Sequence, residues 1–295
     1  MQMLAGRPWS ILFRFRRHRS RDDMMPILTR LRLAAFAAAA IPCLISAQPS
    51  PDPTVLPLPA QTTVVEDVVV PVPREIFATL DRFRHSNWRA VQRPELAKVR
   101  PRTDQAGIAL QLGVAIAEGF VAVEAEDVDE VKQLGRVVLT LARGLGVEKW
   151  ALRRSSSIVE HAEKGDWTAV REEWDGVLPD VQEGMKALKS EQLAQLVSLG
   201  GWVRGTEALS ALILQNYSDT DAVLLRQPAV VEQLAKQMER MPPEIRKEPQ
   251  VKRIRDGLER VRAMPAASDA QVSREQATEM GAIAAGILKE LSKRK

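Results

Sequence analysis

The stretch Leu199-Gly200-Gly201-Trp202-Val203-Arg204-Gly205 lies in the middle of a segment, residues 190–217, whose composition predicts one long helix. Three glycines in seven residues weaken a helix by about 1 kcal/mol each relative to alanine, so close packing must compensate. We expect Gly201 and Gly205 to mark the point where a second helix crosses at short distance. They belong to a set of small residues that recur at steps of three and four and therefore share one helical face: Ala194, Ser198, Gly201, Gly205 and Ala208.

The second helix of this crossing is predicted at residues 103–125. This segment is apolar on nearly all sides, which is typical of a helix at the centre of a fold. Small residues recur along it at steps of four, at Ala109, Gly113 and Ala117, and give it a matching face. Its strongly polar residues ahead of the last turn are spaced by seven and form one narrow stripe: Asp104, Gln111 and Glu118.

The whole chain is predicted to be all-α. Ala, Leu and Val dominate, aromatic residues make up only 4% of the sequence, and Glu, Gln, Lys and Arg lie between the apolar residues. This composition favours helix over strand. The clearest helix follows an N-cap at Asp127 and ends near Leu145, and a capping-box pattern at Ser268 and Gln271 predicts the start of the last helix. We expect an irregular array of about eight helices, paired as antiparallel hairpins, in one domain over residues 74–295.

A proline-rich stretch, residues 48–73, precedes this domain. Its seven prolines exclude a regular helix and favour an extended arm. Residues 62–70 within it have the Val- and Thr-rich composition of a strand, but a lone strand has no pairing partner in an otherwise helical chain. We interpret the stretch as a spacer that lies against the helical body or against a partner.

The first 47 residues have the pattern of an export signal. A basic stretch with Arg30 and Arg32 precedes an alanine-rich apolar run, residues 33–45, and small residues precede a predicted cleavage site after Ala47. The run is shorter than the about 20 residues of a transmembrane helix, so we expect cleavage rather than anchoring. A start at Met24 or Met25 would give a signal of usual length, so residues 1–23 are interpreted as an upstream extension from a misplaced start.

Two alternatives to a cleaved signal stay open. In the first, the basic tract is a cytoplasmic arm. In the second, Cys43 carries a lipid anchor, although Pro42 is not the small residue that lipoprotein signals have before their cysteine. The favoured interpretation is a periplasmic or secreted bacterial protein with no transmembrane segment in its mature part.

The positive net charge of the chain, +4, comes from the predicted export signal, residues 1–47. The first 47 residues hold eight arginines and two acids, which leaves 34 basic and 36 acidic residues in the remainder, so a nucleic-acid partner is not expected. The most basic part of the mature chain is residues 82–102, where a candidate anion-binding surface consists of Arg82, Arg84, His85 and Arg89. The alternative is a solvated loop whose arginines pair with acids elsewhere in the fold.

Few residues suited to catalysis follow the predicted export signal. Beyond residue 47 the chain has two histidines, His85 and His161, one tyrosine and no cysteine. Phosphate-binding loops, nucleophile elbows and paired-histidine zinc patterns are missing from the sequence. We therefore assign no catalytic residues, no metal ligands and no cofactor.

Two charges in the predicted crossing helices, Glu118 and Arg204, form the sharpest candidate for a polar site. If the helices cross at their small faces, the two side chains are buried together. A position in solvent is favoured over this burial, because Glu118 belongs to the polar stripe and Arg204 adjoins Glu207. Trp174 and Trp202 are candidates for an aromatic ligand pocket, although tryptophans at helical spacing are more often core residues.

This set of residues favours a non-enzymatic interaction or scaffolding domain of the bacterial envelope with a protein partner. Two alternatives are a periplasmic ligand-binding protein with a Trp-lined pocket between helices, and a helical hydrolase that uses the carboxylate of Glu118. An enclosed apolar cavity beside Trp202 would favour the first alternative. Converging carboxylates in a cleft would favour the second, and a filled core would favour the interaction domain.

Overall fold

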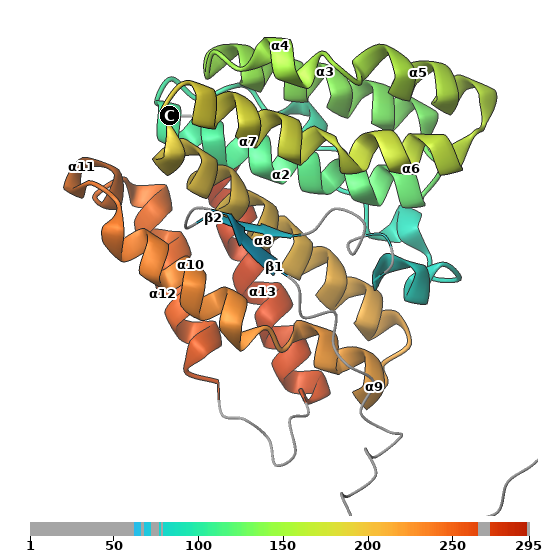
Figure 1. The fold of residues 1–295 in the computed structure, drawn as a ribbon. Helices are drawn as coiled ribbons and strands as arrows, with labels where there is room; N and C mark the ends of the chain where they lie inside the picture. The colour runs from blue at the N-terminus through green and yellow to red at the C-terminus, as the bar shows by residue number, and fades with distance from the viewer. Residues whose placement is uncertain (1–61, 66–67, 72–76, 78, 265–271, 294–295) are drawn as a thin grey trace, which may run out of the picture. The chain divides into compact units, whose positions relative to one another are not determined.

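Helices make up most of the described chain, so the all-α prediction is confirmed (Figure 1). The computed structural model describes residues 62–65, 68–71, 77, 79–264 and 272–293, which all belong to one compact unit spanning Thr54–Lys295. The predicted signal, most of the proline-rich stretch and the Ser268–Gln271 pattern lie outside the described residues.

The described residues contain nine α-helices of at least nine residues, close to the about eight that the sequence predicts. In chain order they are α2 (Gln105–Glu124), α3 (Val128–Gly144), α5 (Ser155–Lys164), α6 (Trp167–Asp175), α7 (Val177–Ala187), α8 (Glu191–Gln215), α10 (Pro228–Arg240), α12 (Pro249–Arg262) and α13 (Arg274–Leu291). Short α-helical turns lie between some of them: α4 (Glu148–Ala151), α9 (Asp219–Ala222) and α11 (Pro243–Arg246). Four 3-10 helices complete the described elements: η1 (Asp81–Phe83), η2 (Trp88–Ala90), η3 (Leu96–Lys98) and η4 (Val223–Leu225).

Helices α2 and α8 cross at close range and share the most extensive contact between any two elements. A methyl group at Gly113 would lie 1.9 Å from the backbone oxygen of Val197, and one at Gly200 would lie 2.1 Å from the backbone oxygen of Leu110. The absence of side chains at these two glycines therefore permits the contact, and the predicted crossing of segments 103–125 and 190–217 is confirmed.

The predicted crossing point is confirmed at Gly201 and is wrong at Gly205. A methyl group at Gly113 of α2 would lie 2.8 Å from the backbone nitrogen of Gly201, whereas one at Gly205 would meet nothing within 4 Å. Neighbouring residues of an α-helix point about 100° apart, because 3.6 residues make one turn. Gly200 therefore faces α2, while the exposed Gly205 points away from it.

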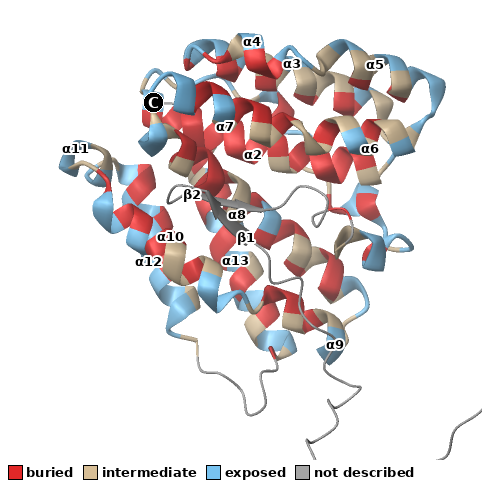
Figure 2. Cartoon of the chain, in the orientation of Figure 1, coloured by how far each residue is buried: buried red, intermediate tan, exposed pale blue. Residues whose placement is uncertain are grey.

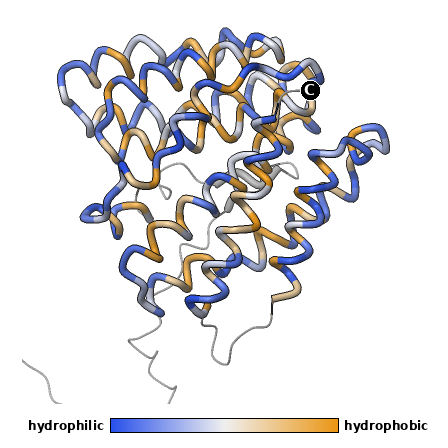
Figure 3. Tube along the Cα trace, turned by 180° about the vertical axis from the view of Figure 1, so that it is seen from behind, coloured by the Kyte–Doolittle hydropathy of each residue, from blue (hydrophilic) through white to orange (hydrophobic). Residues whose placement is uncertain are grey.

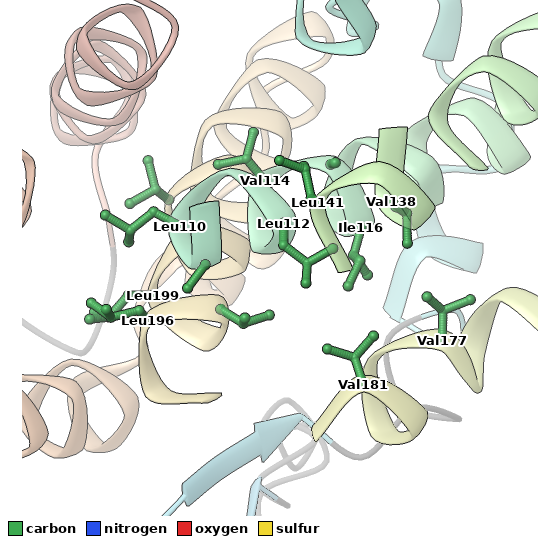
Figure 4. Close-up of a cluster of buried hydrophobic side chains, with 14 of the residues drawn as sticks. Leu110, Leu112, Val114, Ile116, Val138, Leu141, Val177, Val181, Leu196 and Leu199 are labelled. Carbon is green, nitrogen blue, oxygen red and sulfur yellow. The ribbon is translucent and has the colours of Figure 1, made fainter. Parts of the chain in front are cut away.

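The main hydrophobic core surrounds this crossing (Figure 2). Figure 4 shows leucines of α2 and α8 together with valines of α3 and α7 in this cluster: Leu110, Leu112, Leu196, Leu199, Val138, Val177 and Val181. A second cluster, which includes Leu212, Ile213 and Met280, lies where the C-terminal half of α8 packs against α13. Figure 3 shows the alternation of polar and apolar residues along the outer helices α10 and α12, whose apolar residues join the main core.

Helix α2 is the one helix of the described chain that is long and apolar enough to cross a membrane. Within this fold, however, 94% of its apolar window is buried inside the protein. It packs against α8, α3 and α6. The structure thus places it as a core helix, as its apolar composition predicts.

Local sequence signals account for several helix ends. The Asp127 side chain accepts a hydrogen bond from the backbone N–H of Glu130 at 3.1 Å, so the predicted cap of α3 is confirmed. Gly165 ends α5 with a φ of 71°, a left-handed conformation that suits glycine. Pro179 lies in the first turn of α7, where a missing N–H costs no helical hydrogen bond.

The last helix starts later than the Ser268 pattern predicts. Helix α13 begins at Arg274, and Ser273 forms the capping box with Gln276. The backbone N–H of Gln276 donates to Ser273 Oγ at 3.2 Å, and the backbone N–H of Ser273 donates to Gln276 Oε1 at 2.9 Å. The same spacing of serine and glutamine thus occurs twice within a few residues, and the second copy caps the helix.

Residues 62–65 and 68–71 pair as antiparallel strands, which corrects the argument that a strand in this stretch would have no pairing partner. Strand β1 (Thr62–Val65) pairs with β2 (Val68–Pro71), with Thr62 opposite Pro71 and Val65 opposite Val68. The stretch supplies its own pairing partner by folding back on itself. Strand β2 lies against α8 and α10 (Figure 1).

Candidate functional site

The candidate site is a network of four charged side chains at the crossing of α2 and α8. Arg204 Nε donates to Glu118 Oε2 at 2.5 Å, and neither side chain has exposed surface. Arg204 Nη1 donates to Glu207 Oε2 at 2.5 Å. Arg93 donates from Nη2 to Glu207 Oε1, also at 2.5 Å. Two arginines and two glutamates therefore neutralise one another, three of them buried and Arg93 partly exposed.

The preference for a solvent-facing Glu118 and Arg204 is wrong, because the loop before α2 covers both residues. Arg204 Nη2 donates to the backbone oxygen of Val91 at 2.8 Å. The backbone N–H of Arg93 donates to Glu118 Oε1 at 2.6 Å. Each of the four carboxylate oxygens in the network thus accepts a hydrogen bond, and two of the contacts end on main-chain atoms of the loop.

The other two residues of the polar stripe on α2 hold the rest of the same loop. Gln111 Nε2 donates to the backbone oxygen of Arg100 at 3.2 Å, and Gln111 Oε1 accepts from the backbone N–H of Arg102 at 3.0 Å. The side chain of Arg102 pairs with Asp104 at 3.0 Å. The polar stripe of α2, which sequence spacing identifies, is therefore the surface that binds residues 91–102. This role was not predicted from the sequence.

Burial and hydrogen bonding keep Glu118 out of reach of an outside molecule in this conformation. Burial raises the pKa of Glu118, while the charge of Arg204 and the N–H donors of Arg93 and Arg204 act in the opposite direction. Both of its oxygens are bonded and the residue has no exposed surface. A general acid or base must lie within hydrogen-bond reach of its substrate, and Glu118 in this conformation does not.

A second buried carboxylate, Glu124, lies at the C-terminal end of α2. Its Oε1 is 3.0 Å from Arg171 Nε, and its side chain is 6% exposed. This contact lacks hydrogen-bond geometry, since the oxygen has no hydrogen-bond partner. Burial raises the pKa of Glu124 to about 7, despite the charge of Arg171. Arg171 also pairs with Asp81 at 2.6 Å and stacks over the ring of Phe77 at 4.6 Å.

The candidate anion-binding surface is partly neutralised. Arg82 pairs with Asp221 at 2.8 Å, and Arg89 pairs with Asp127 at 3.2 Å. Arg84 and His85 contact each other, with Arg84 Nε donating to His85 Nε2 at 3.2 Å. Arg82 and Arg89 thus follow the alternative in which the arginines of this segment pair with acids elsewhere in the fold.

The two tryptophan candidates do not converge on a pocket. Trp174 is 1% exposed, and its indole N–H donates to the backbone oxygen of Ile116 at 3.1 Å. It packs against Gly119, where a methyl group would lie 1.7 Å from its ring. Trp202 is partly buried and packs against the main core. Two pockets among the described residues, one between α10 and α12 and one between residues 97–101 and α3, are lined by other side chains.

Within the described ranges, no group of three or more His, Cys, Asp or Glu side chains is placed to hold a metal ion. The fold and the network together define an all-α protein with an internally neutralised buried charge cluster. Comparison of the chain with protein-family models, with curated proteins and with solved structures gave no match. What the chain does is therefore argued from its own residues alone.

Proposed function

We propose that this chain is an exported, non-enzymatic interaction domain of the bacterial envelope, and that it binds a protein partner through the basic segment 82–102. The observation that supports this proposal is that two buried charged side chains bind the main chain of a surface loop. Arg204 and Glu118 use their hydrogen bonds to hold the main chain at Val91 and Arg93. A network of this kind fixes the conformation of a loop.

The fixed loop presents its remaining cations to solvent. Arg84, Lys98 and Arg100 are exposed, whereas the chain around them is anchored at Arg93 and Arg102. Loops positioned by a rigid scaffold are where binding residues concentrate in proteins. Basic side chains on such a loop favour a partner with acidic groups.

The two alternative functions gain no comparable support. A hydrolase that uses Glu118 needs that carboxylate to reach a substrate, and both of its oxygens are occupied. A Trp-lined ligand pocket needs Trp174 at a cavity, and its ring fills the core beside Gly119. The interaction domain requires neither.

The proposal also includes features predicted from the sequence. These are cleavage after Ala47, a proline-rich arm over residues 48–73 and a domain over 74–295 whose helices pair as antiparallel hairpins. An extended arm would separate the domain from a point of attachment or extend from it toward a partner.

Site-specific photo-crosslinking in the organism that makes the protein tests the proposal. A benzophenone amino acid is placed at Arg100, and a matched probe is placed at Lys252, an exposed cation on α12. We expect a discrete protein adduct from position 100 only, in the envelope fraction, on a chain whose N-terminus is Gln48. A chain that stays in the cytoplasm, or one that gives no adduct from any exposed position of segment 82–102, would contradict it.

A further inference from the structure

A shallow groove lies between residues 97–101 and α3. Its volume is about 470 Å³, within the range of about 300–1,000 Å³ that is typical of binding pockets. One wall is formed by Ala97, Val99 and Pro101, and the other by side chains from Gln133 to Leu141 of α3. Ala97 belongs to the 3-10 helix η3, and the chain continues from it into the groove wall at Val99 and Pro101.

The first wall carries backbone groups without partners. Val99 has an extended conformation, with φ −65° and ψ 131°. In the part of the chain that the structure describes, the backbone N–H groups of Val99 and Arg100 donate no hydrogen bond, and the backbone oxygen of Val99 accepts none. The flanking residues are fixed, because Gln133 Nε2 donates to the backbone oxygen of Ala97 at 3.4 Å and Gln111 binds Arg100 and Arg102. Val99 therefore offers one unpaired donor and one unpaired acceptor, the main-chain groups with which an added strand pairs.

The rim of the groove is cationic. Arg136 lines it, and Lys98 and Arg100 lie along the first wall; all three side chains belong to exposed residues. Arg100 and Arg136 make no ion pair among the described residues, in contrast with the neighbouring Lys132, which pairs with Glu163 at 2.5 Å. Glu95 is the one exposed acid next to this wall. The charge pattern is therefore complementary to carboxylates.

From these three observations we propose that the groove binds an extended segment of a partner protein that carries alternating apolar side chains and at least one carboxylate. The eight-residue step from Gln133 to Leu141 corresponds to about 12 Å of helix, which accommodates about four residues of an extended chain. The added segment pairs its main chain with the N–H and C=O of Val99. Its apolar side chains pack against Val137 and Leu141, and its carboxylate pairs with Arg136 or Arg100. This inference rests on the proposed function and names the partner's chemistry.

Selection from a displayed library of random 12-residue linear peptides on the immobilised full-length chain provides the probe. We expect the selected peptides to share alternating apolar residues with Asp or Glu among them. The dominant peptide is then made with a fluorescent label, and its dissociation constant is measured by anisotropy. A copy that is N-methylated at alternate residues tests the main-chain pairing, and it is expected to bind at least tenfold more weakly.

Two variants of the protein locate the site. Arg136→Glu reverses the charge on the rim, and Thr140→Trp fills the groove from an exposed position of α3. Each is expected to weaken peptide binding at least tenfold, with circular dichroism melting curves that match the unmodified chain. Lys252→Glu makes the same change of charge at an exposed position on α12 and is expected to bind the peptide normally.

The inference is overturned if no peptide is selected, if the N-methylated copy binds equally well, or if both groove variants bind like the unmodified chain. These results are distinguishable from failure of the proposed function. A crosslinked partner at position 100 whose capture is unaffected by Arg136→Glu would keep the interaction domain and reject the groove.

Discussion

Arg204 Nε lies 2.5 Å from Glu118 Oε2 at a place where neither side chain has any exposed surface. The two residues come from the two helices that cross most closely, and each also binds the main chain of the loop that covers them. Buried ion pairs contribute little net stability relative to well-packed apolar residues, but removal of one partner leaves a buried charge without compensation. This asymmetry makes the pair accessible to experiment.

Replacing Arg204 with Met is expected to lower the free energy of unfolding by about 3–5 kcal/mol, because Glu118 is then buried without a cation and Glu207 keeps only Arg93. Glu118→Gln leaves Arg204 paired with Glu207 and is expected to lower the free energy of unfolding by less than Arg204→Met does. The measurement is urea unfolding followed by circular dichroism. Arg260→Ala provides the control, since Arg260 and Glu279 form an exposed pair at 3.2 Å whose loss costs about 0–1 kcal/mol. Equal stability of the Arg204 and Arg260 variants would contradict the buried network.

Alanine substitutions at different glycines of the crossing helices are expected to change stability in opposite directions. Gly113→Ala and Gly200→Ala place a methyl group about 2 Å from backbone oxygens of the facing helix, and such overpacking costs about 1–3 kcal/mol or more. Gly205→Ala adds its methyl group where nothing lies within 4 Å and is expected to stabilise α8 by about 1 kcal/mol or less. Thermal melting of the three variants checks this. A stabilising Gly200→Ala would mean that the helices are farther apart than described.

The pKa of Glu124 predicts a dependence of stability on pH. A carboxyl whose pKa is raised from 4.5 to about 7 on folding binds a proton more readily in the folded state, so its contribution is present at low pH and is lost as pH rises through this window. The expected loss is about 1–3 kcal/mol between pH 5 and pH 7.5. Urea unfolding at both pH values measures it.

Glu124→Gln serves as the matched control for this pH effect, because glutamine cannot ionise. The variant is expected to lose less stability than the unmodified chain over the same pH interval. Indistinguishable losses in the two proteins would show that Glu124 titrates normally and that Arg171 fully compensates its burial.

The loop held by the network is expected to loosen when Arg93 is shortened. Arg93→Ala removes the second donor to Glu207, which leaves a buried carboxylate oxygen unpaired at a cost of about 1–3 kcal/mol. Hydrogen exchange should accelerate across residues 88–102 more than in α3. Arg84→Ala, which changes an exposed arginine of the same segment, should leave exchange unchanged. Equal exchange rates of residues 88–102 in the two variants would contradict a loop that is fixed by the charge network.

The sequence predicts the helices of this fold better than it predicts what covers them. Small residues at helical spacing were sufficient to pair α2 with α8, and Asp127 was sufficient to start α3. The same pattern placed Gly205 on the contact face and left out Gly200, because spacing defines a face without showing how the helix is rotated relative to its neighbour. The distances at the two positions decide between them.

The candidate site illustrates a different limit. The stripe of Asp104, Gln111 and Glu118 is visible in the sequence, but a polar stripe on a helix is equally compatible with water and with a covering loop. Residues 91–102 have no period of their own, and their position follows from hydrogen bonds such as that between Arg93 and Glu118. Contacts of an irregular segment depend on the finished fold, so the burial of Arg204 was not predictable from spacing.

The distance of the pair along the chain has a consequence for how the protein reaches its native state. Glu118 and Arg204 are 86 residues apart, and the loop that completes their hydrogen bonds precedes both. A chain that emerges N-terminus first therefore presents the acidic residue well before its cation, and an assembly of α2 and α3 alone would hold an uncompensated buried carboxylate. The helices up to α7 are consequently expected to have no stable fold without α8.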